Sequence, residues 1–174
     1  MDNDRVFDPN GQAGKWRNFG FDKLQHRLDA FEVQQPSKHV VRVRIATRVA
    51  PPIRAGAIRC EYVYTIYASG DVLLDVHGEP VGQLPDTMPK IGLQLKAPEQ
   101  FEYVSWYGLG PGESYIDSLQ AQRVGLYGGM VDDLYTPYVF PQDNGNRYDT
   151  RWMTLTNRRG LGLAAIGQPT FEFS

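Results

Sequence analysis

The chain has 174 residues, of which 41% are hydrophobic and 22% are charged, and its formal net charge is -2 at pH 7. This length fits one domain with a core of its own, and this composition excludes an intrinsically disordered protein. The weak acidity, together with the absence of a basic stripe, excludes a nucleic-acid-binding protein, and no apolar run is long enough to predict a membrane span.

The cysteine content and the first residues indicate the compartment. A single cysteine, Cys60, excludes an internal disulfide framework and favours a reducing environment. The polar and acidic start, Met-Asp-Asn-Asp-Arg, does not have the pattern of a signal peptide. We therefore expect a cytoplasmic protein. The 18 glycines, 12 prolines and 12% aromatic residues favour an all-β fold.

Turns and strands alternate in the first half of the chain. Residues 1–20 contain many turn-forming residues and predict a long loop with one short helix near residues 14–18. Residues 41–46 alternate between apolar and polar side chains, as a half-buried strand does. Residues 60–76 predict a β-hairpin whose turn lies at residues 68–71, followed by a loop.

Further strands are predicted in the second half, with one helical turn at residues 118–123. The predicted strands are residues 91–95, 101–107, 150–156, 161–166 and 170–173. Antiparallel strands joined by long loops predict a β-sandwich that forms a single domain over residues 1–174. Both ends of the chain look cut rather than capped, and open edge strands favour pairing with another polypeptide.

The chemically richest region runs from Trp106 to Trp152, where aromatic, carboxylate, amide and guanidinium groups lie among glycines and prolines. Aromatic rings stack on the apolar faces of sugars, and they also anchor protein interfaces. The region is therefore either a sugar site or an interface, and we favour the interface. The candidate substrate-binding or interface residues are Trp106, Tyr115, Asp117, Tyr135, Tyr138, Asn144, Arg147, Arg151 and Trp152.

Several carboxylates in this region could form the pair of carboxyl groups that glycoside hydrolysis needs. The available carboxylates are Glu113, Asp117, Asp132, Asp133 and Asp143. Because no spacing resembles a catalytic dyad, we expect these groups to cap turns and to pair with arginines. Two interpretations stay open for Asn144, Asn146, Arg147 and Arg151. In one, they bind sugar hydroxyls or hold a neighbouring carboxylate. In the other, Asn144-Gly145 forms a tight turn and the arginines form ion pairs with Asp132, Asp133 or Asp149.

Other residue types give no sign of a metal or cofactor. His26, His39 and His77 lack the spacing of metal ligands. Cys60 lies inside a predicted strand, so we expect it to be buried and inert. The glycine-rich run 108–112 contains a proline and no helix follows it, so it is not a dinucleotide-binding loop. These residue types therefore predict no metal site and no dinucleotide-binding loop.

The same motifs carry a family resemblance. They read Trp-Tyr-Gly-Leu-Gly-Pro-Gly-Glu-Ser-Tyr-Ile-Asp from Trp106, Tyr-Thr-Pro-Tyr-Val-Phe-Pro-Gln-Asp-Asn-Gly from Tyr135, and Arg-Trp at residues 151–152. This ordered set resembles the last domain of family 2 β-galactosidases, which is also called the β-galactosidase small-chain domain. Asp-Asn-Asp-Arg at residues 2–5, followed by Trp16 and Gly20, is similar to the opening of that domain.

The resemblance implies a fold, and it implies that the catalytic residues lie in another domain. The fold would be the N-terminal portion of an antiparallel super-sandwich of the galactose mutarotase type. In the family a separate TIM-barrel domain holds the two catalytic glutamates and the Mg and Na sites, so this chain would hold none of them. The last domain packs beside the barrel and helps to wall the galactose pocket. The tryptophan by which it touches the sugar lies downstream of the region matched here.

The function that we expect from the resemblance is an accessory, non-catalytic β-sandwich in an enzyme that hydrolyses terminal β-galactosides such as lactose with retention. Its partners would be the remainder of the β-galactosidase and, indirectly, the sugar. One alternative is a free-standing carbohydrate-binding sandwich that stacks sugars on Trp106, Tyr138 or Trp152. Another is an aldose-epimerase-like protein, which would need a histidine acid and a carboxylate base in one concave site.

Overall fold

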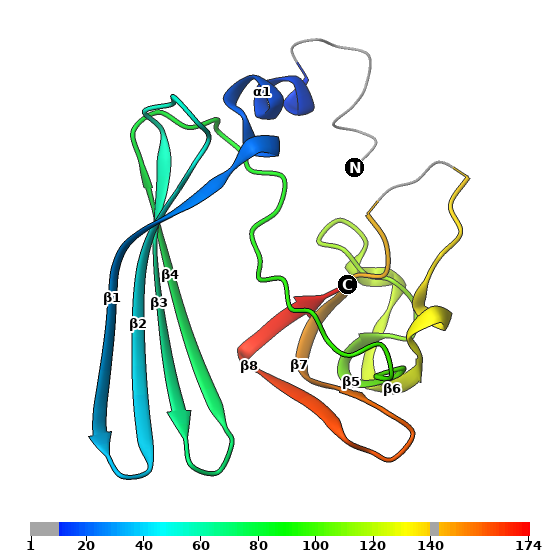
Figure 1. Ribbon diagram of the computed structural model, residues 1–174. Helices are drawn as coiled ribbons and strands as arrows, with labels where there is room; N and C mark the ends of the chain where they lie inside the picture. The colour runs from blue at the N-terminus through cyan, green and yellow to red at the C-terminus, as the bar shows by residue number, and fades with distance from the viewer. Residues whose placement is uncertain (1–10, 140–142) are drawn as a thin grey trace. The chain divides into compact units, whose positions relative to one another are not determined.

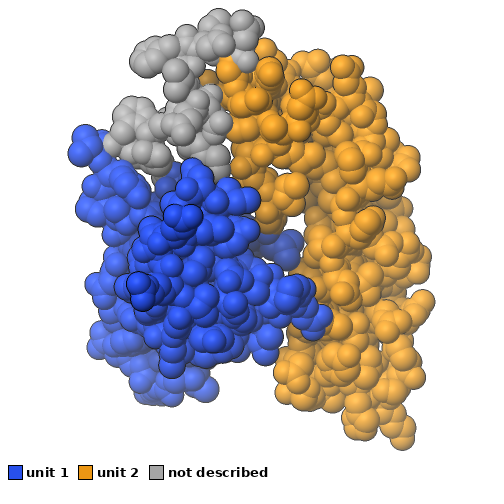
Figure 2. All heavy atoms as spheres, turned by 180° about the vertical axis from the view of Figure 1, so that it is seen from behind, with its two compact units in different colours: residues 1, 93–174 blue, residues 2–92 orange. Residues whose placement is uncertain are grey.

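The described residues contain two four-stranded antiparallel sheets (Figure 1). The computed structural model describes residues 11–139 and 143–174. The described residues form two compact units, one ending at residue 92 and one beginning at residue 93 (Figure 2). The predicted all-β class and antiparallel pairing are confirmed, whereas a single domain over residues 1–174 stays a prediction. Residues 2–5, with which the family resemblance opens, lie outside the described residues.

A short helix precedes the first sheet. Helix α1 (Gln12–Phe19) confirms the helix predicted near residues 14–18, and a 3-10 turn, η2 (Phe21–Lys23), follows it. Gly20 ends the helix with φ of 103°, a left-handed conformation that glycine adopts without strain, and its N–H donates to the carbonyl of Trp16. The indole N–H of Trp16 donates to the carbonyl of Thr87 at 2.9 Å, which ties the helix to a later loop of the same unit.

The first sheet is an antiparallel meander in which each strand pairs with the next in the chain. Its strands are β1 (Gln25–Ser37), β2 (Val40–Ala50), β3 (Ala57–Tyr67) and β4 (Val72–Val81). The hairpin predicted over residues 60–76 is confirmed as β3 and β4. Strand β4 is longer than predicted, because residues 78–80 pair with β3 instead of forming a loop.

The register gives this sheet two chemically different faces. Val43 pairs with Val33 and Tyr64, and Tyr64 pairs with Leu74, so apolar side chains align across all four strands. The apolar face consists of Leu28, Phe31, Val33, Val41, Val43, Ile45, Ile58, Tyr62, Tyr64, Ile66, Val72, Leu74 and Val76. The polar face, displaced by one residue, carries Glu32, Gln34, Arg42, Arg44, Arg48, Arg59, Glu61, Asp75, His77 and Glu79. The alternation read from residues 41–46 is therefore confirmed.

The second sheet has the strand order β6-β5-β7-β8. Its strands are β5 (Tyr103–Gly110), β6 (Arg123–Met130), β7 (Arg147–Thr156) and β8 (Gly162–Phe173). Trp106 on the inner strand β5 is only 1% exposed, and its ring lies 5.6 Å from the ring of Tyr127 and 5.8 Å from that of Phe173. The core of this unit is therefore built around Trp106.

Some predicted elements are wrong. Residues 91–95 form no strand, although their side chains alternate; Ile91 is 82% exposed. Strands β1 and β6 are not predicted by the sequence, and residues 161–166 and 170–173 belong to one strand, β8. A 3-10 turn, η3 (Leu119–Ala121), confirms the helical turn predicted at residues 118–123.

Candidate functional site

The nine candidate residues all lie in the unit that begins at residue 93, on strands β5 and β7 and on the two loops that flank β6. These loops are residues 111–122 and 131–146, and the second contains the 3-10 turn η4 (Val131–Leu134). Residues 140–142, which form part of the family motif, lie outside the described residues.

The two loops are joined by the carboxylate of Glu113. The hydroxyl of Tyr115 donates to Oε2 of Glu113 at 2.8 Å, and the hydroxyl of Tyr138 donates to Oε1 at 2.8 Å. The backbone N–H of Gly145 donates to Oε2 at 2.9 Å. Each oxygen of Glu113 is thus engaged, and Tyr115 and Tyr138, two of the candidate residues, are brought together by it.

Hydrogen bonding fixes the charge of this carboxylate. Burial, the largest single influence, opposes ionisation of Glu113, but the hydrogen bonds from Thr136, Tyr115, Gly145 and Tyr138 together lower its pKa below the usual value. Burial and then the bond to Glu113 raise the pKa of Tyr115. Glu113 is therefore an ionised acceptor that holds neighbouring donors, which is the opposite of a general acid with a raised pKa.

Asn144 is bound to Thr136 within the loop over residues 131–146. Its Oδ1 accepts the backbone N–H of Thr136 at 3.0 Å, and its Nδ2 donates to the carbonyl of Thr136. The side-chain amide therefore pairs with a backbone amide as a neighbouring strand would. This use of Asn144 supports the interpretation as a turn residue.

Two polar residues that the sequence did not single out, Ser114 and Glu172, complete the base of the loops together with Asn146. Ser114, fully buried, accepts the N–H of Tyr148 on its Oγ at 2.9 Å. Asn146, 4% exposed, donates from Nδ2 to the carbonyl of Ser114 at 2.8 Å and to Oε2 of Glu172 at 2.9 Å. Buried polar groups need such partners. The only signal for Ser114 in the sequence is that it adjoins Glu113.

Arg147 is a core residue. It is 3% exposed, its guanidinium lies 5.3 Å from the ring centre of Trp106, and it donates to the carbonyl of Gly145 at 2.7 Å. Burial lowers the pKa of Arg147, while the nearby charge of Glu113 acts in the opposite direction. Arg147 covers the indole of Trp106 by a cation–π contact, so these two candidates pack on each other and present no open face to a sugar.

Arg151 and Trp152 lie on β7. Arg151 forms an ion pair with Asp149 at 2.9 Å, as one of the two interpretations predicts, and its guanidinium lies 5.6 Å from the ring centre of Tyr107. Trp152, half-buried, pairs across the sheet with Tyr107 and with Ile166, which is 78% exposed. Tyr107, Trp152 and Ile166 therefore share one partly uncovered face of the sheet.

Asp117, Asp132, Asp133 and Tyr135 stand apart from the group around Glu113. Asp117 and Asp132 are exposed, Tyr135 is 67% exposed, and Asp133 accepts the N–H of Met130 at 3.3 Å. The structure gives these residues no shared partner. They therefore do not assemble into a site with Glu113.

The structure does not bring the metal-ligating residue types or the three histidines together among the described residues. Within residues 11–139 and 143–174, no group of three or more His, Cys, Asp or Glu side chains could hold a metal ion. His26 lies in register with the apolar face and His77 with the polar face of the first sheet, while His39 lies in a turn. Among the described helices, none has the length and apolarity needed to cross a bilayer.

Comparison with known proteins gives one consistent family. The family model described as "Beta galactosidase small chain" matches residues 1–174. The chain is 37% identical over 148 residues to a β-galactosidase of Vibrio cholerae, and these residues make up 85% of the chain. It is 33% identical over 168 residues, 96% of its length, to a β-galactosidase of Lactococcus lactis, and 31% identical over 159 residues, 87% of its length, to one of Priestia megaterium. The matched regions make up 14%, 15% and 16% of the Vibrio, Priestia and Lactococcus proteins.

Proposed function

The chain belongs to the β-galactosidase small-chain family, and on this premise we propose that it is the accessory, non-catalytic β-sandwich part of a β-galactosidase. One observation carries the proposal: the family model spans the whole chain, while the chain spans only 14–16% of the relatives. Enzymes of that length have room for a separate catalytic domain. The whole enzyme would hydrolyse terminal β-galactosides such as lactose, with its catalytic glutamates and its Mg and Na sites in the barrel domain.

The chemistry of Glu113 supports a non-catalytic role. Retaining glycosidases need one carboxylate free to attack the sugar and a second carboxyl group about 5 Å away. Both oxygens of Glu113 are instead occupied by Tyr115, Tyr138 and the N–H of Gly145. This arrangement suits a group that shapes loops.

The small core supports a role as one piece of a larger assembly. Among the described residues only five hydrophobic side chains are buried, namely Val49, Ala57, Val104, Trp106 and Leu109, whereas 24 large hydrophobic side chains are exposed. The hydrophobic effect favours covering such surfaces. We propose that the rest of the β-galactosidase supplies this cover.

The loop over residues 131–146 is the part that we propose to wall the active site. Tyr135 and Tyr138 are 67% and 42% exposed, and exposed tyrosines are preferred anchors of protein contacts. The bonds of Glu113 and Asn144 fix the base of this loop. Residues held in this way can help to shape a neighbouring pocket without themselves touching the reacting atoms.

Reconstitution tests the proposal. The purified chain is mixed with a β-galactosidase polypeptide from which the matching segment has been deleted, and hydrolysis of a chromogenic β-galactoside is followed. We expect no turnover by either component alone and activity in the mixture that saturates with added chain. The control replaces the chain by an unrelated β-sandwich protein. Turnover by the pure chain, or a mixture as inactive as the control, would contradict the proposal.

A further inference from the structure

A cavity lies on the polar face of the β1–β4 sheet, in the unit that ends at residue 92 and outside the region between Trp106 and Trp152. Its volume is about 420 Å³, within the range of about 300–1,000 Å³ that is typical of ligand pockets. All four strands contribute to its lining. The lining side chains that matter for recognition are Glu32, Gln34, Arg42, Arg44, Tyr67 and Asp75.

One side of the cavity is fixed by ion pairs. Nε of Arg44 donates to Glu61 at 2.8 Å, and NH1 of Arg44 lies 3.2 Å from the carboxylate of Glu32. Glu32 and Arg44 are direct cross-strand partners. Because opposite charges on neighbouring strands stabilise each other's positions, this part of the lining is arranged before any ligand arrives.

The other polar side chains of the cavity have no partner. Within the described part of the chain, the side chains of Gln34, Arg42 and Asp75 form no hydrogen bond or ion pair. They stand on three different strands, with Gln34 directly opposite Arg42. The cavity therefore offers a guanidinium donor, a carboxylate acceptor and an amide that both donates and accepts.

We propose that this cavity binds a neutral saccharide. Two arginines, Arg42 and Arg44, balance two carboxylates, Glu32 and Asp75, so the lining favours no net ligand charge. Val63 lies between Arg44 and Asp75, which places these two residues two strands apart, or about 10 Å at the usual strand spacing. A sugar with several hydroxyls can bridge donors and acceptors over that distance, whereas a small ion cannot. Tyr67, 40% exposed, adds an aromatic ring for an apolar sugar face.

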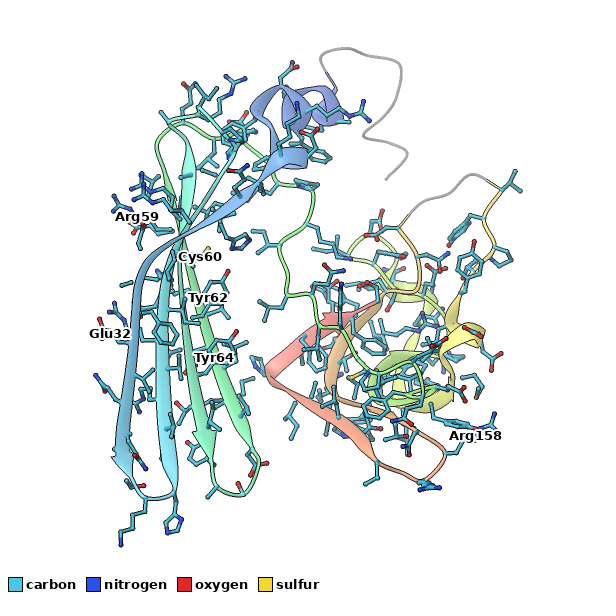
Figure 3. The ribbon with its side chains drawn as sticks, in the orientation of Figure 1. Glu32, Arg59, Cys60, Tyr62, Tyr64 and Arg158 are labelled. Atoms are coloured by element: carbon cyan, nitrogen blue, oxygen red, sulfur yellow. The ribbon has the colours of Figure 1, made fainter. Side chains whose placement is uncertain are left out.

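Because the sheet has one apolar and one polar face, we expect protein to cover the apolar face and the cavity on the polar face to stay open to a ligand. Figure 3 shows Glu32 and Arg59 on one side of the sheet and Tyr62 and Tyr64 on the other. The apolar side gains more from being covered by protein, since burying charged groups costs free energy unless each is paired. The polar face with its unpaired Gln34, Arg42 and Asp75 is suited to contact with a hydrated ligand.

Chemical-shift mapping tests the saccharide site. The ¹⁵N-labelled 174-residue chain is titrated with galactose, with lactose and, separately, with inorganic phosphate. We expect a sugar to cause saturable shifts of the amides of Arg42, Thr65 and Leu73, which line one row of the sheet, with a dissociation constant on the order of 1 mM. No saturable shift with either sugar, or shifts caused by phosphate and not by sugars, would overturn the proposal.

Variants separate the cavity from the rest of the polar face. Arg42→Ala and Asp75→Asn should each weaken sugar binding at least tenfold, whereas Arg59→Ala, on the same face but outside the cavity, should leave it within twofold. Unchanged signals elsewhere in the spectrum report that each variant is folded. Wild-type affinity in the Arg42→Ala chain would contradict the assignment. Reconstitution of hydrolysis is a separate measurement, so this site and the proposed function can fail independently.

Discussion

At the residue scale, Glu113 shows how a carboxylate in a glycosidase family can serve structure. Its position between Gly112 and Ser114 in a glycine-rich turn is compatible with a catalytic or a structural role when only the sequence is considered. The hydrogen-bond partners of Glu113 favour the structural role, because Tyr115, Tyr138 and the N–H of Gly145 all donate to its carboxylate. A carboxylate that accepts several hydrogen bonds is stabilised in its charged form.

Replacing the carboxylate of Glu113 should therefore destabilise the protein in a pH-dependent way. We expect Glu113→Gln to lower the free energy of unfolding by about 1–3 kcal/mol at pH 7, since hydrogen bonds to charged groups are the stronger kind. The folded-state pKa is lowered, so this stability is present above the unfolded-state pKa of about 4.3 and is lost as the pH falls through the lower folded-state value. Urea unfolding at several pH values measures it.

The matched control for this variant is Asp117→Asn, which changes an exposed carboxylate four residues away. The control should alter the free energy of unfolding by less than about 0.5 kcal/mol. A Glu113→Gln variant that is as stable as the control at pH 7, or a stability difference that grows as the medium becomes acidic, would contradict the structural role of Glu113.

At the element scale, the contact between β5 and β7 depends on a glycine. Gly108 lies opposite Gly125 of β6, and a Cβ atom at position 108 would lie 2.8 Å from Cα and 2.9 Å from Oγ1 of Thr150 on β7. Thr150 itself is fully buried, with its hydroxyl donating to the carbonyl of Arg147. The backbones therefore approach closely because no side chain separates them.

A Gly108→Ala substitution should force β7 away from β5. We expect the free energy of unfolding to fall by about 1–3 kcal/mol, as for other cases of overpacking, and the melting temperature to fall with it. Gly92→Ala is the control, because a Cβ atom there meets nothing within 4 Å and should change stability by less than about 0.5 kcal/mol. Equal melting temperatures for the two variants would show that β5 and β7 do not approach as described.

The elements also show what the sequence could and could not predict. The alternation around Val43 predicts β2 correctly because one face is apolar along its length. In β1 a register shift between Leu28 and Ala30 interrupts the alternation, and in β6 three glycines remove side chains that would reveal a strand. Residues 91–95 alternate without forming a strand, because alternation describes side chains and does not supply a hydrogen-bonding neighbour.

The sequence indicated which loops carry the candidate residues, but it did not predict most of the contacts that these residues make. Clustering of aromatic and charged residues identified the loops that Glu113 joins, and the pairing of Arg151 with Asp149 was one of two open interpretations. Stacking of Arg147 on Trp106 was not predicted, because that contact depends on how β5 and β7 pair. The cavity with Arg42 and Asp75 was not predicted either, because it combines residues of four strands whose register the sequence does not state.

At the scale of the whole molecule, the exposed apolar residues of the β1–β4 sheet indicate where an interaction partner would bind. On β1, Leu28, Phe31 and Val33 are 57–59% exposed, and on β4 Val72 and Val76 are 55% and 47% exposed. They share one face of the sheet, so they form a surface instead of a scatter of single residues. A surface of this kind is what an interaction partner would cover.

Placing charge on this surface should therefore disrupt assembly without unfolding the sheet. In the reconstitution assay we expect the chain with Phe31→Lys and Val33→Lys to need at least tenfold more protein for half-maximal activity, because each lysine would have to be buried against the partner. The melting temperature should change little, since both wild-type side chains are more than half exposed. The control is Glu79→Lys on the polar face, which should reconstitute like the wild-type chain. If the double variant reconstitutes as well as the control, the apolar face is not the surface that meets the rest of the enzyme.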